Sequence, residues 1–250
     1  MHDALLPALS APLLNLAAGL TPNERDALKF RIAVLACAEL DDDFALAIDP
    51  TRRERFSQLL SYLPAIQPFG ARIPPYGLAY RGRPGFLTDA LLAALREEAA
   101  QYRPRARENY GQFLHTVDTD GGDSVCETLA ASTELAELVR RHAGPCRHSQ
   151  ITSYIYYEQA GQCSKPHVDN AFTAVTAMVG LRHDCAAEVE RASASVIYWP
   201  GLAPFDYRLA PGELALFFGI GALHGRYPVA AAETVHSLLM SFVPEDATHG

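Results

Sequence analysis

Cysteine is scarce in this chain of 250 residues: there are five, an odd number, and no two of them form a Cys-x-x-Cys pair. This usage argues against a disulfide framework and against a zinc ribbon. No apolar run reaches the roughly 18 residues that a membrane-spanning helix needs, and the apolar amino terminus lacks the basic region that begins a signal peptide. The sequence therefore predicts a cytoplasmic protein that has no contact with a membrane.

Basic residues are also few. Lys and Arg number 21 against 29 Asp and Glu, which gives a formal net charge of −8 at pH 7. This balance opposes non-specific binding to phosphate polymers, and no stretch interleaves aromatic and basic residues as nucleic-acid-binding segments do. Hydrophobic residues make up 49% of the chain, enough for a sizeable core. We expect a small-molecule substrate and no nucleic acid, while the oligomeric state stays unknown.

The first 146 residues have a mainly helical pattern. Thr21-Pro22-Asn23-Glu24 is a capping box with proline at the first helical position, and it predicts a helix that continues to about Leu40. Similar signals predict further segments: a helix after Thr51, an irregular stretch over residues 64–86, a helix after Thr88, a loop over residues 116–124 and a short helix over residues 132–142.

After Arg147 the pattern changes to short runs that are rich in β-branched and aromatic residues and separated by glycine and proline. These runs are ITSYIYY, AVTAMVGL, ASVIYW, ELALFF and HSLLMSF. Their spacing predicts antiparallel strands of a sandwich or jelly roll. We expect one domain over residues 1–250 with a mainly β, α+β fold. In it, helices of residues 1–146 support a double-stranded β-helix (jelly-roll, cupin-like) core over residues 147–243.

The candidate active site is centred on His167 and Asp169, which are residues i and i+2 of a predicted strand and so face the same way. His224 lies in a second predicted strand. Two imidazoles and one carboxylate make up the triad that leaves coordination positions open and suits non-heme Fe(II). These three residues are the predicted catalytic and metal-binding residues. His115, His148 and His183 lack a partner at metal-ligand spacing and are expected at the surface or in loops.

The order of residues around the triad resembles the Fe(II)/2-oxoglutarate-dependent oxygenases, particularly the prolyl-hydroxylase-like branch. In that family a tyrosine-bearing strand and a glycine turn precede the His-x-Asp pair, as Tyr157 and Gly161 do here. A Pro-Gly turn then leads an apolar strand, here Pro211–Phe218, and Pro-Val follows the distal histidine, here Pro228-Val229. The resemblance implies a jelly-roll fold, Fe(II) held by the triad, and 2-oxoglutarate and O2 as co-substrates. It also implies hydroxylation, or another oxidation, of a C–H bond in a small molecule such as an amino acid or a biosynthetic intermediate.

One position departs from the family pattern. The family carries Arg-x-Ser on the last strand, where the arginine pairs with the distal carboxylate of 2-oxoglutarate, but Val235 and Ser237 stand there in this chain. A dicarboxylate buried without a cation would carry a heavy desolvation cost. We expect Arg226 to replace the lost charge in an exchange with Val235 between adjacent strands. Arg226 lies two residues beyond His224 and so faces the same way on its strand.

Several alternatives remain open. Arg182, at the end of a predicted strand, is a second candidate for the cation, whereas His236 should point outward by strand alternation. Tyr157 is a candidate co-substrate residue or an ordinary packing residue. At the level of function, the alternatives are an iron oxidase of the same fold that does not use 2-oxoglutarate, and a jelly-roll module that binds metal without turnover.

Overall fold

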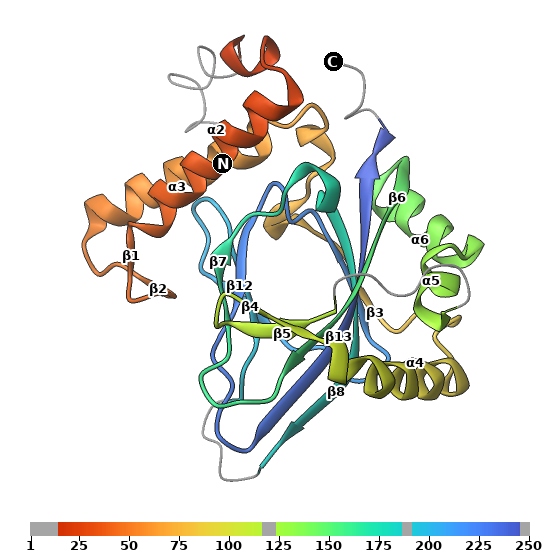
Figure 1. The fold of residues 1–250 in the computed structure, drawn as a ribbon. Helices are drawn as coiled ribbons and strands as arrows, with labels where there is room; N and C mark the ends of the chain where they lie inside the picture. The colour runs from red at the N-terminus through yellow and green to blue at the C-terminus, as the bar shows by residue number, and fades with distance from the viewer. Residues whose placement is uncertain (1–14, 117–123, 187–191, 246–250) are drawn as a thin grey trace.

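The computed structural model describes residues 15–116, 124–186 and 192–245 (Figure 1). Its labelled helices are α2 (Pro22–Cys37), α3 (Pro50–Ala65), α4 (Asp89–Tyr102), α5 (Val125–Ala130) and α6 (Thr133–Ala143). Short 3₁₀ turns occupy Gly70–Arg72, Pro75–Gly77, Arg103–Arg105 and Ala171–Thr173. The predicted loop over residues 116–124 lies almost wholly outside the described residues. No helix in the described ranges is long and apolar enough to cross a membrane.

The helices begin close to the predicted capping signals. The Thr21 side chain accepts a hydrogen bond from the Glu24 N–H while the Glu24 carboxylate accepts one from the Thr21 N–H, so the predicted capping box is present. Helix α3 is capped by Asp49, shortly before the predicted Thr51, and Thr88 caps α4 as predicted. In each case a side-chain oxygen satisfies a backbone N–H that has no partner within the helix.

All strand pairs are antiparallel, as predicted for the second half of the chain. A seven-stranded sheet has the order β3-β11-β8-β13-β6-β5-β4, and a four-stranded sheet has the order β10-β9-β12-β7. The larger sheet consists of β3 (Leu78–Gly82), β4 (Arg107–Asn109), β5 (Phe113–His115), β6 (Cys146–Tyr157), β8 (Val175–Cys185), β11 (Leu214–Phe217) and β13 (Glu233–Pro244). The smaller one consists of β7 (Ser164–His167), β9 (Ser195–Tyr198), β10 (Phe205–Tyr207) and β12 (Leu223–Arg226), and β1 (Leu40–Asp41) pairs with β2 (Ala45–Leu46).

Three strands of the larger sheet come from the part of the chain predicted to be helical or irregular, so that prediction is corrected. Strand β3 lies within residues 64–86 and pairs with β11, while β4 and β5 extend the opposite edge beside β6. These strands are only three to five residues long. Pairing with strands distant in sequence, rather than a local pattern, keeps them extended, because strand propensity depends strongly on context.

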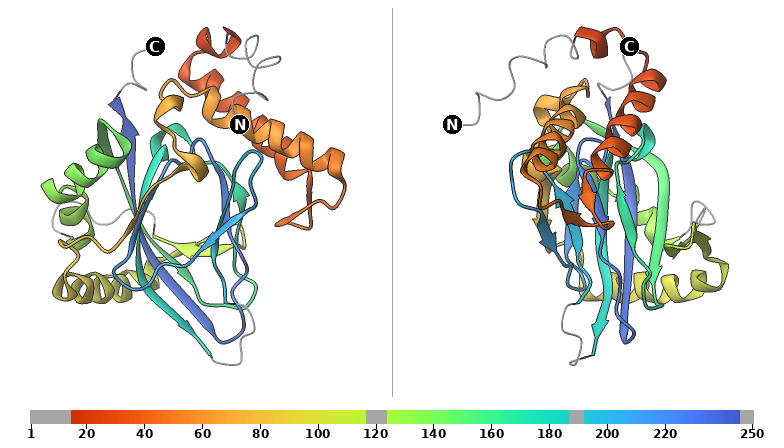
Figure 2. Two further views of the ribbon diagram at one scale, coloured as in Figure 1. Left: turned by 180° about the vertical axis from the view of Figure 1, so that it is seen from behind. Right: turned by 90° about the vertical axis from the view of Figure 1, so that its left-hand side faces the viewer.

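Helices cover the outer sides of the two sheets. The core cluster that contains Leu95 of α4, Cys126 of α5 and Val139 of α6 also contains Tyr154 and Leu238 of the larger sheet. A second cluster joins α2 and α3 to Val168, Val196, Tyr198 and Leu223 of the smaller sheet and its connections. Figure 2 shows the α2–α3 hairpin and the α4–α6 group on different sides of the sheets. The helical layer therefore supports both sheets rather than forming a separate body.

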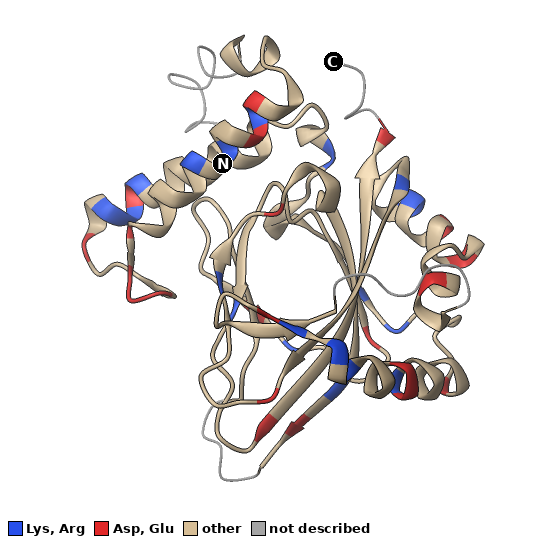
Figure 3. Cartoon of the chain, viewed as in Figure 1, with Lys and Arg blue, Asp and Glu red and all other residues tan. Residues whose placement is uncertain are grey.

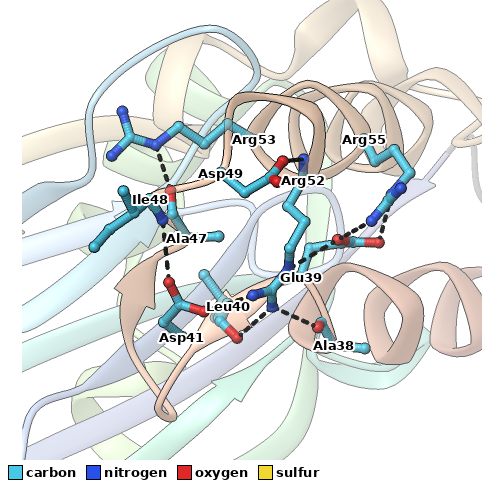
Figure 4. A network of polar contacts seen from close by, with 10 residues as sticks. All are labelled: Ala38, Glu39, Leu40, Asp41, Ala47, Ile48, Asp49, Arg52, Arg53 and Arg55. Atoms are coloured by element: carbon cyan, nitrogen blue, oxygen red, sulfur yellow. Dashed lines mark hydrogen bonds and ion pairs between the residues drawn. The ribbon is translucent and has the colours of Figure 1, made fainter.

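Charged residues of both signs lie along the α2–α3 hairpin and along α4 (Figure 3). At one end of the hairpin they form the network drawn in Figure 4. Arg55 of α3 donates two hydrogen bonds to the Glu39 carboxylate, at 2.9 and 3.0 Å, and Arg52 pairs with Asp41 at 2.6 Å. This network ties the end of α2 and the β1–β2 hairpin to α3.

Candidate active site

A cavity of about 250 Å³ lies between the inner faces of the two sheets. The larger sheet contributes side chains from β5, β6, β8, β11 and β13, and the smaller sheet contributes side chains from β7, β9, β10 and β12. The three predicted metal ligands, together with Tyr157 and Arg226, line this cavity. Residues that are far apart in sequence thus meet in one cavity.

The predicted metal ligands form a compact group. One ligand atom from each of His167, Asp169 and His224 lies within 4.8 Å of the others. The Nε2 atoms of His167 and His224 are 3.7 and 3.8 Å from the Asp169 Oδ1 atom. Strands β7 and β12 are antiparallel neighbours in which His167 lies opposite His224. Strand pairing therefore places the distal histidine beside the His-x-Asp pair.

Backbone carbonyl groups fix the orientation of both imidazoles. The Nδ1 atom of His167 lies 2.8 Å from the Lys165 carbonyl oxygen, and the Nδ1 atom of His224 lies 2.9 Å from the Ala222 carbonyl oxygen. A carbonyl oxygen only accepts, so Nδ1 carries the proton and Nε2 presents its lone pair. Burial, with the nearby His167, lowers the pKa of His224 to about 4. Both features keep its Nε2 available as a neutral ligand.

Hydrogen bonds hold both the carboxylate and the backbone of Asp169. Its Oδ2 atom accepts a hydrogen bond from the Thr176 hydroxyl at 3.3 Å, and its backbone N–H donates to the Gly219 carbonyl at 2.9 Å. A Cβ atom on Gly219 would lie 1.9 Å from Asp169 Oδ2. Glycine at position 219 is therefore required for the carboxylate to occupy this place.

Arg226 is a buried cation that opens onto the same cavity. The residue is only 4% exposed, and its Nη1 and Nη2 atoms donate to the hydroxyls of Ser193 and Ser195, each at 3.2 Å. The guanidinium also lies 5.3 Å from the centre of the Tyr157 ring, and its burial lowers the pKa of Arg226. Within the described residues no carboxylate lies at ion-pair distance from it. Buried charges are normally paired, so this guanidinium is suited to an anionic ligand.

Val235, at the position where the family carries arginine, belongs to an apolar cluster with Ile155, Tyr157 and Val229. It is buried and faces Tyr157 across the β13–β6 pair. The prediction that the exchange of Arg226 with Val235 occurs between adjacent strands is wrong, because β12 and β13 belong to different sheets. Arg226 and Val235 instead lie on the two facing sheets, each beside the Tyr157 ring.

The structure places the alternative cation elsewhere. The Arg182 side chain is 51% exposed, and its Nε atom lies 2.5 Å from Asp184 Oδ2. It lines a second cavity, of about 520 Å³, whose other lining residues come from α4, from Arg103 in the 3₁₀ turn that follows it, and from the larger sheet. His236 lies in the same cavity with its Nε2 atom 2.8 Å from Glu158 Oε1. His236 thus points outward as predicted, and Arg182 is not brought to the triad.

Some residues of the cavity escaped the sequence analysis. Ser195 and Ile197 alternate along one face of β9, a signal that would have placed Ser195 in the cavity. Tyr207 lies in a three-residue strand too short to show a pattern. His115, expected at the surface or in a loop, lines the cavity from β5 because that strand pairs with β6. Burial, with the positive charge of Arg107, lowers the pKa of His115.

No family model and no curated protein matches the chain, but solved structures do. The non-heme α-ketoglutarate-dependent epimerase SnoN from nogalamycin biosynthesis matches with a TM-score of 0.57 and 20% identity, over 75% of this chain and 83% of that one. A Pseudomonas putida prolyl-4-hydroxylase matches with a TM-score of 0.53 and 14% identity, over 74% and 99% of the chains. HygX from Streptomyces hygroscopicus, with nickel, 2-oxoglutarate and hygromycin B bound, matches with a TM-score of 0.52 and 14% identity, over 68% and 83%.

These neighbours identify the fold of the chain. The chain has the fold of the Fe(II)/2-oxoglutarate-dependent oxygenases, and a member of the prolyl-hydroxylase branch is among the matching structures. The resemblance predicted from the residues around His167 and His224 is confirmed at the level of the fold.

Proposed function

We propose that this protein is an Fe(II)- and 2-oxoglutarate-dependent oxygenase that oxidises, most simply by hydroxylation, a C–H bond of a small molecule. The observation that carries the proposal is the meeting, in one cavity, of three convergent ligand atoms and the buried Arg226 guanidinium. Structures of the same fold support the cofactors: SnoN has been solved with Fe³⁺ and α-ketoglutarate, and HygX with nickel and 2-oxoglutarate.

In this proposal, Nε2 of His167, Oδ1 of Asp169 and Nε2 of His224 hold Fe(II). The donor set fits this ion, because two neutral imidazoles and one carboxylate leave positions open for further ligands. When bound, the iron supplies the activation of O2, coupled to oxidative decarboxylation of 2-oxoglutarate to succinate and CO2. The carbonyl groups that accept from the two Nδ1–H groups keep the imidazoles oriented throughout.

Arg226 is proposed to bind the distal carboxylate of 2-oxoglutarate. A guanidinium presents two parallel N–H donors that match a carboxylate, and such charge-assisted bonds are strong where water is excluded. Ser193 and Ser195 hold the guanidinium from one side, and Tyr157 packs over its face. This arrangement would replace the arginine that the family carries at the position of Val235.

The substrate is proposed to be a small biosynthetic intermediate that is largely apolar and uncharged. Apart from the triad and Arg226, the described lining of the cavity is aliphatic and aromatic, with hydroxyl groups and His115 as the polar exceptions. A free amino acid would bring an ammonium and a carboxylate group without partners of opposite charge among these residues. Two neighbours support a small-molecule substrate: SnoN is an epimerase from nogalamycin biosynthesis, and HygX has been solved with hygromycin B bound.

We further propose that residues 1–250 form a single domain around a jelly-roll core. Two antiparallel sheets that face each other across a cavity support this description. The core would extend beyond residues 147–243, because β3, β4 and β5 complete the larger sheet.

The first experiment needs no substrate. Under anaerobic conditions, Fe(II) and then 2-oxoglutarate are added to the purified protein, and the visible charge-transfer absorption of the iron–keto acid chelate is recorded. The wild-type protein should develop this absorption, and His224→Ala should not. Iron binding without the chelate absorption would favour the oxidase that does not use 2-oxoglutarate. A protein that forms the chelate but releases no succinate with any member of a panel of neutral substrates would favour the non-catalytic metal-binding module.

A further inference from the structure

Helix α2 contacts the backbone of the segment that carries the His-x-Asp pair. Lys29 is fully buried, with an exposed fraction of 0%. Its ammonium group donates one hydrogen bond to Asp26, one helical turn earlier, at 2.6 Å, and another to the main-chain carbonyl oxygen of Asp169. A lysine from the helical layer therefore bonds directly to the backbone of a proposed metal ligand.

Asp26 completes this contact on the other side of the same turn. While its Oδ1 atom accepts from Lys29, its Oδ2 atom accepts a hydrogen bond from the Ala171 N–H at 3.2 Å. The two side chains together satisfy one backbone acceptor, the Asp169 carbonyl, and one backbone donor, the Ala171 N–H. We call this pair, Asp26 and Lys29, the α2 clamp.

The rest of α2 supports the preceding residues of the same segment. The Cys37 thiol donates to the Pro166 carbonyl oxygen, with the sulfur and oxygen 3.3 Å apart. Val168, between the two proposed ligands, packs in the cluster that contains Ile32 and Ala36 of α2. The helix thus contacts the segment before, within and after the His-x-Asp pair.

Burial makes the clamp sensitive to change. A buried ammonium group is stable only when its donors are bonded, and removal of one partner of a buried charged pair is strongly destabilising for the group left behind. A metal site also requires supporting contacts that hold each ligand within about 0.5 Å of the geometry that binds the ion. Lys29 and Asp26 bond to the backbone at Asp169 and Ala171, from which the Asp169 side chain extends.

We propose that Asp26 and Lys29 are positioning residues of the metal site, through which helix α2 sets the place of the Asp169 carboxylate. This inference rests on the proposed function, because it assumes that Asp169 is a metal ligand. It assigns the helical layer a part in metal binding beyond covering the smaller sheet.

The test compares Lys29→Met with wild-type protein in Co(II) binding, followed by calorimetry and by the visible d–d spectrum of the bound ion. Contacts that orient metal ligands typically contribute 10–100-fold to affinity. Because Lys29 acts through the backbone, we expect a loss near the lower end, about tenfold, with a changed d–d spectrum. The matched control is Arg55→Met, which removes the ion pair with Glu39 on the same hairpin (Figure 4). This variant should leave the Co(II) affinity and the d–d spectrum unchanged.

A second variant covers the case in which Lys29→Met does not fold. Ala171→Pro removes only the N–H that Asp26 accepts and keeps the ion pair intact; Ala171 begins a 3₁₀ turn, where proline is tolerated, and Asn170 before it is extended. We expect a weaker loss of Co(II) affinity in this variant. Folded Lys29→Met or Ala171→Pro protein with the affinity and spectrum of the wild type would overturn the clamp. If the wild-type protein itself bound no Co(II), the proposed function would fail first, and the inference with it.

Discussion

Replacement of Arg226 by methionine tests the proposed co-substrate site most directly. The methionine side chain has a similar length and no charge, so it fills the space between Ser195 and the Tyr157 ring while it removes the cation. In the wild-type protein the guanidinium is buried and donates hydrogen bonds to two neutral hydroxyls. A carboxylate of 2-oxoglutarate bound there would lose a charge-assisted pair in a place from which water is excluded.

The size of the effect follows from the burial. Truncation of one partner of a buried, hydrogen-bonded charge pair costs about 2–5 kcal/mol, and each 1.4 kcal/mol is a factor of ten. The dissociation constant for 2-oxoglutarate should therefore rise about 30-fold or more in Arg226→Met. Arg226→Lys keeps the charge but cannot present two parallel donors, so a smaller rise is expected. Iron affinity should change little, because the guanidinium is not itself one of the three proposed ligands and donates its hydrogen bonds to Ser193 and Ser195.

The assay is an anaerobic titration of the Fe(II) protein with 2-oxoglutarate, followed by the absorption of the chelate. Arg182→Ala is the control, since this half-exposed side chain pairs with Asp184 outside the cavity. The reverse double variant, Arg226→Met with Val235→Arg, should recover part of the lost affinity, because both positions border the Tyr157 ring. An unchanged dissociation constant in Arg226→Met, or a large rise in Arg182→Ala alone, would refute the assignment of the cation.

Three further predictions concern the triad and the larger sheet. Gly219→Ala should abolish Fe(II) binding, since the new Cβ would lie 1.9 Å from Asp169 Oδ2, and circular dichroism would confirm that the variant is folded. Chelation of the metal by EDTA should lower the melting temperature of the wild-type protein but not that of His224→Ala, because a ligand that binds only the native state stabilises it. Burial lowers the pKa of His148 below that of the unfolded chain, so its contribution to stability is complete above about pH 6.5 and declines as the pH falls. Urea unfolding at pH 7 and pH 5 should therefore show a smaller loss for His148→Gln than for the wild-type protein, and equal losses would count against this role of His148.

The features that the sequence predicted correctly are those with a local signal. The capping box at Thr21 depends on residues within one helical turn, and it appears as predicted. The shared direction of His224 and Arg226 follows from the two-residue period of strand β12. The prediction that Asp169 lies in the same strand as His167 is wrong, because β7 ends at His167, but the Asp169 side chain still reaches the cavity. All four side chains line one cavity. These inferences needed no knowledge of which strands pair.

The features that the sequence did not predict depend on pairing over long distances. Strand β3, in a stretch rich in proline and glycine, is extended because it pairs with β11 near the end of the chain. The prediction that Arg226 and Val235 lie on adjacent strands was wrong because sheet membership is set by the order in which strands pair. Lys29 gave no signal, since a lysine on a helix is ordinarily solvated and only the fold shows that its partner is the carbonyl of Asp169.

The position of the cation has a structural consequence for the proposed site. Placed on β12, Arg226 shares a short strand with the metal ligand His224, and this strand is paired on both sides, with β7 and with β9. Gly225 between them permits the close approach of β7, since a Cβ there would lie 2.5 Å from the Ser164 carbonyl oxygen. The separation of the metal ligand from the carboxylate anchor is thus set within one strand. An arginine at position 235, on the larger sheet, would instead be separated from His224 by a distance that depends on the spacing between the two sheets.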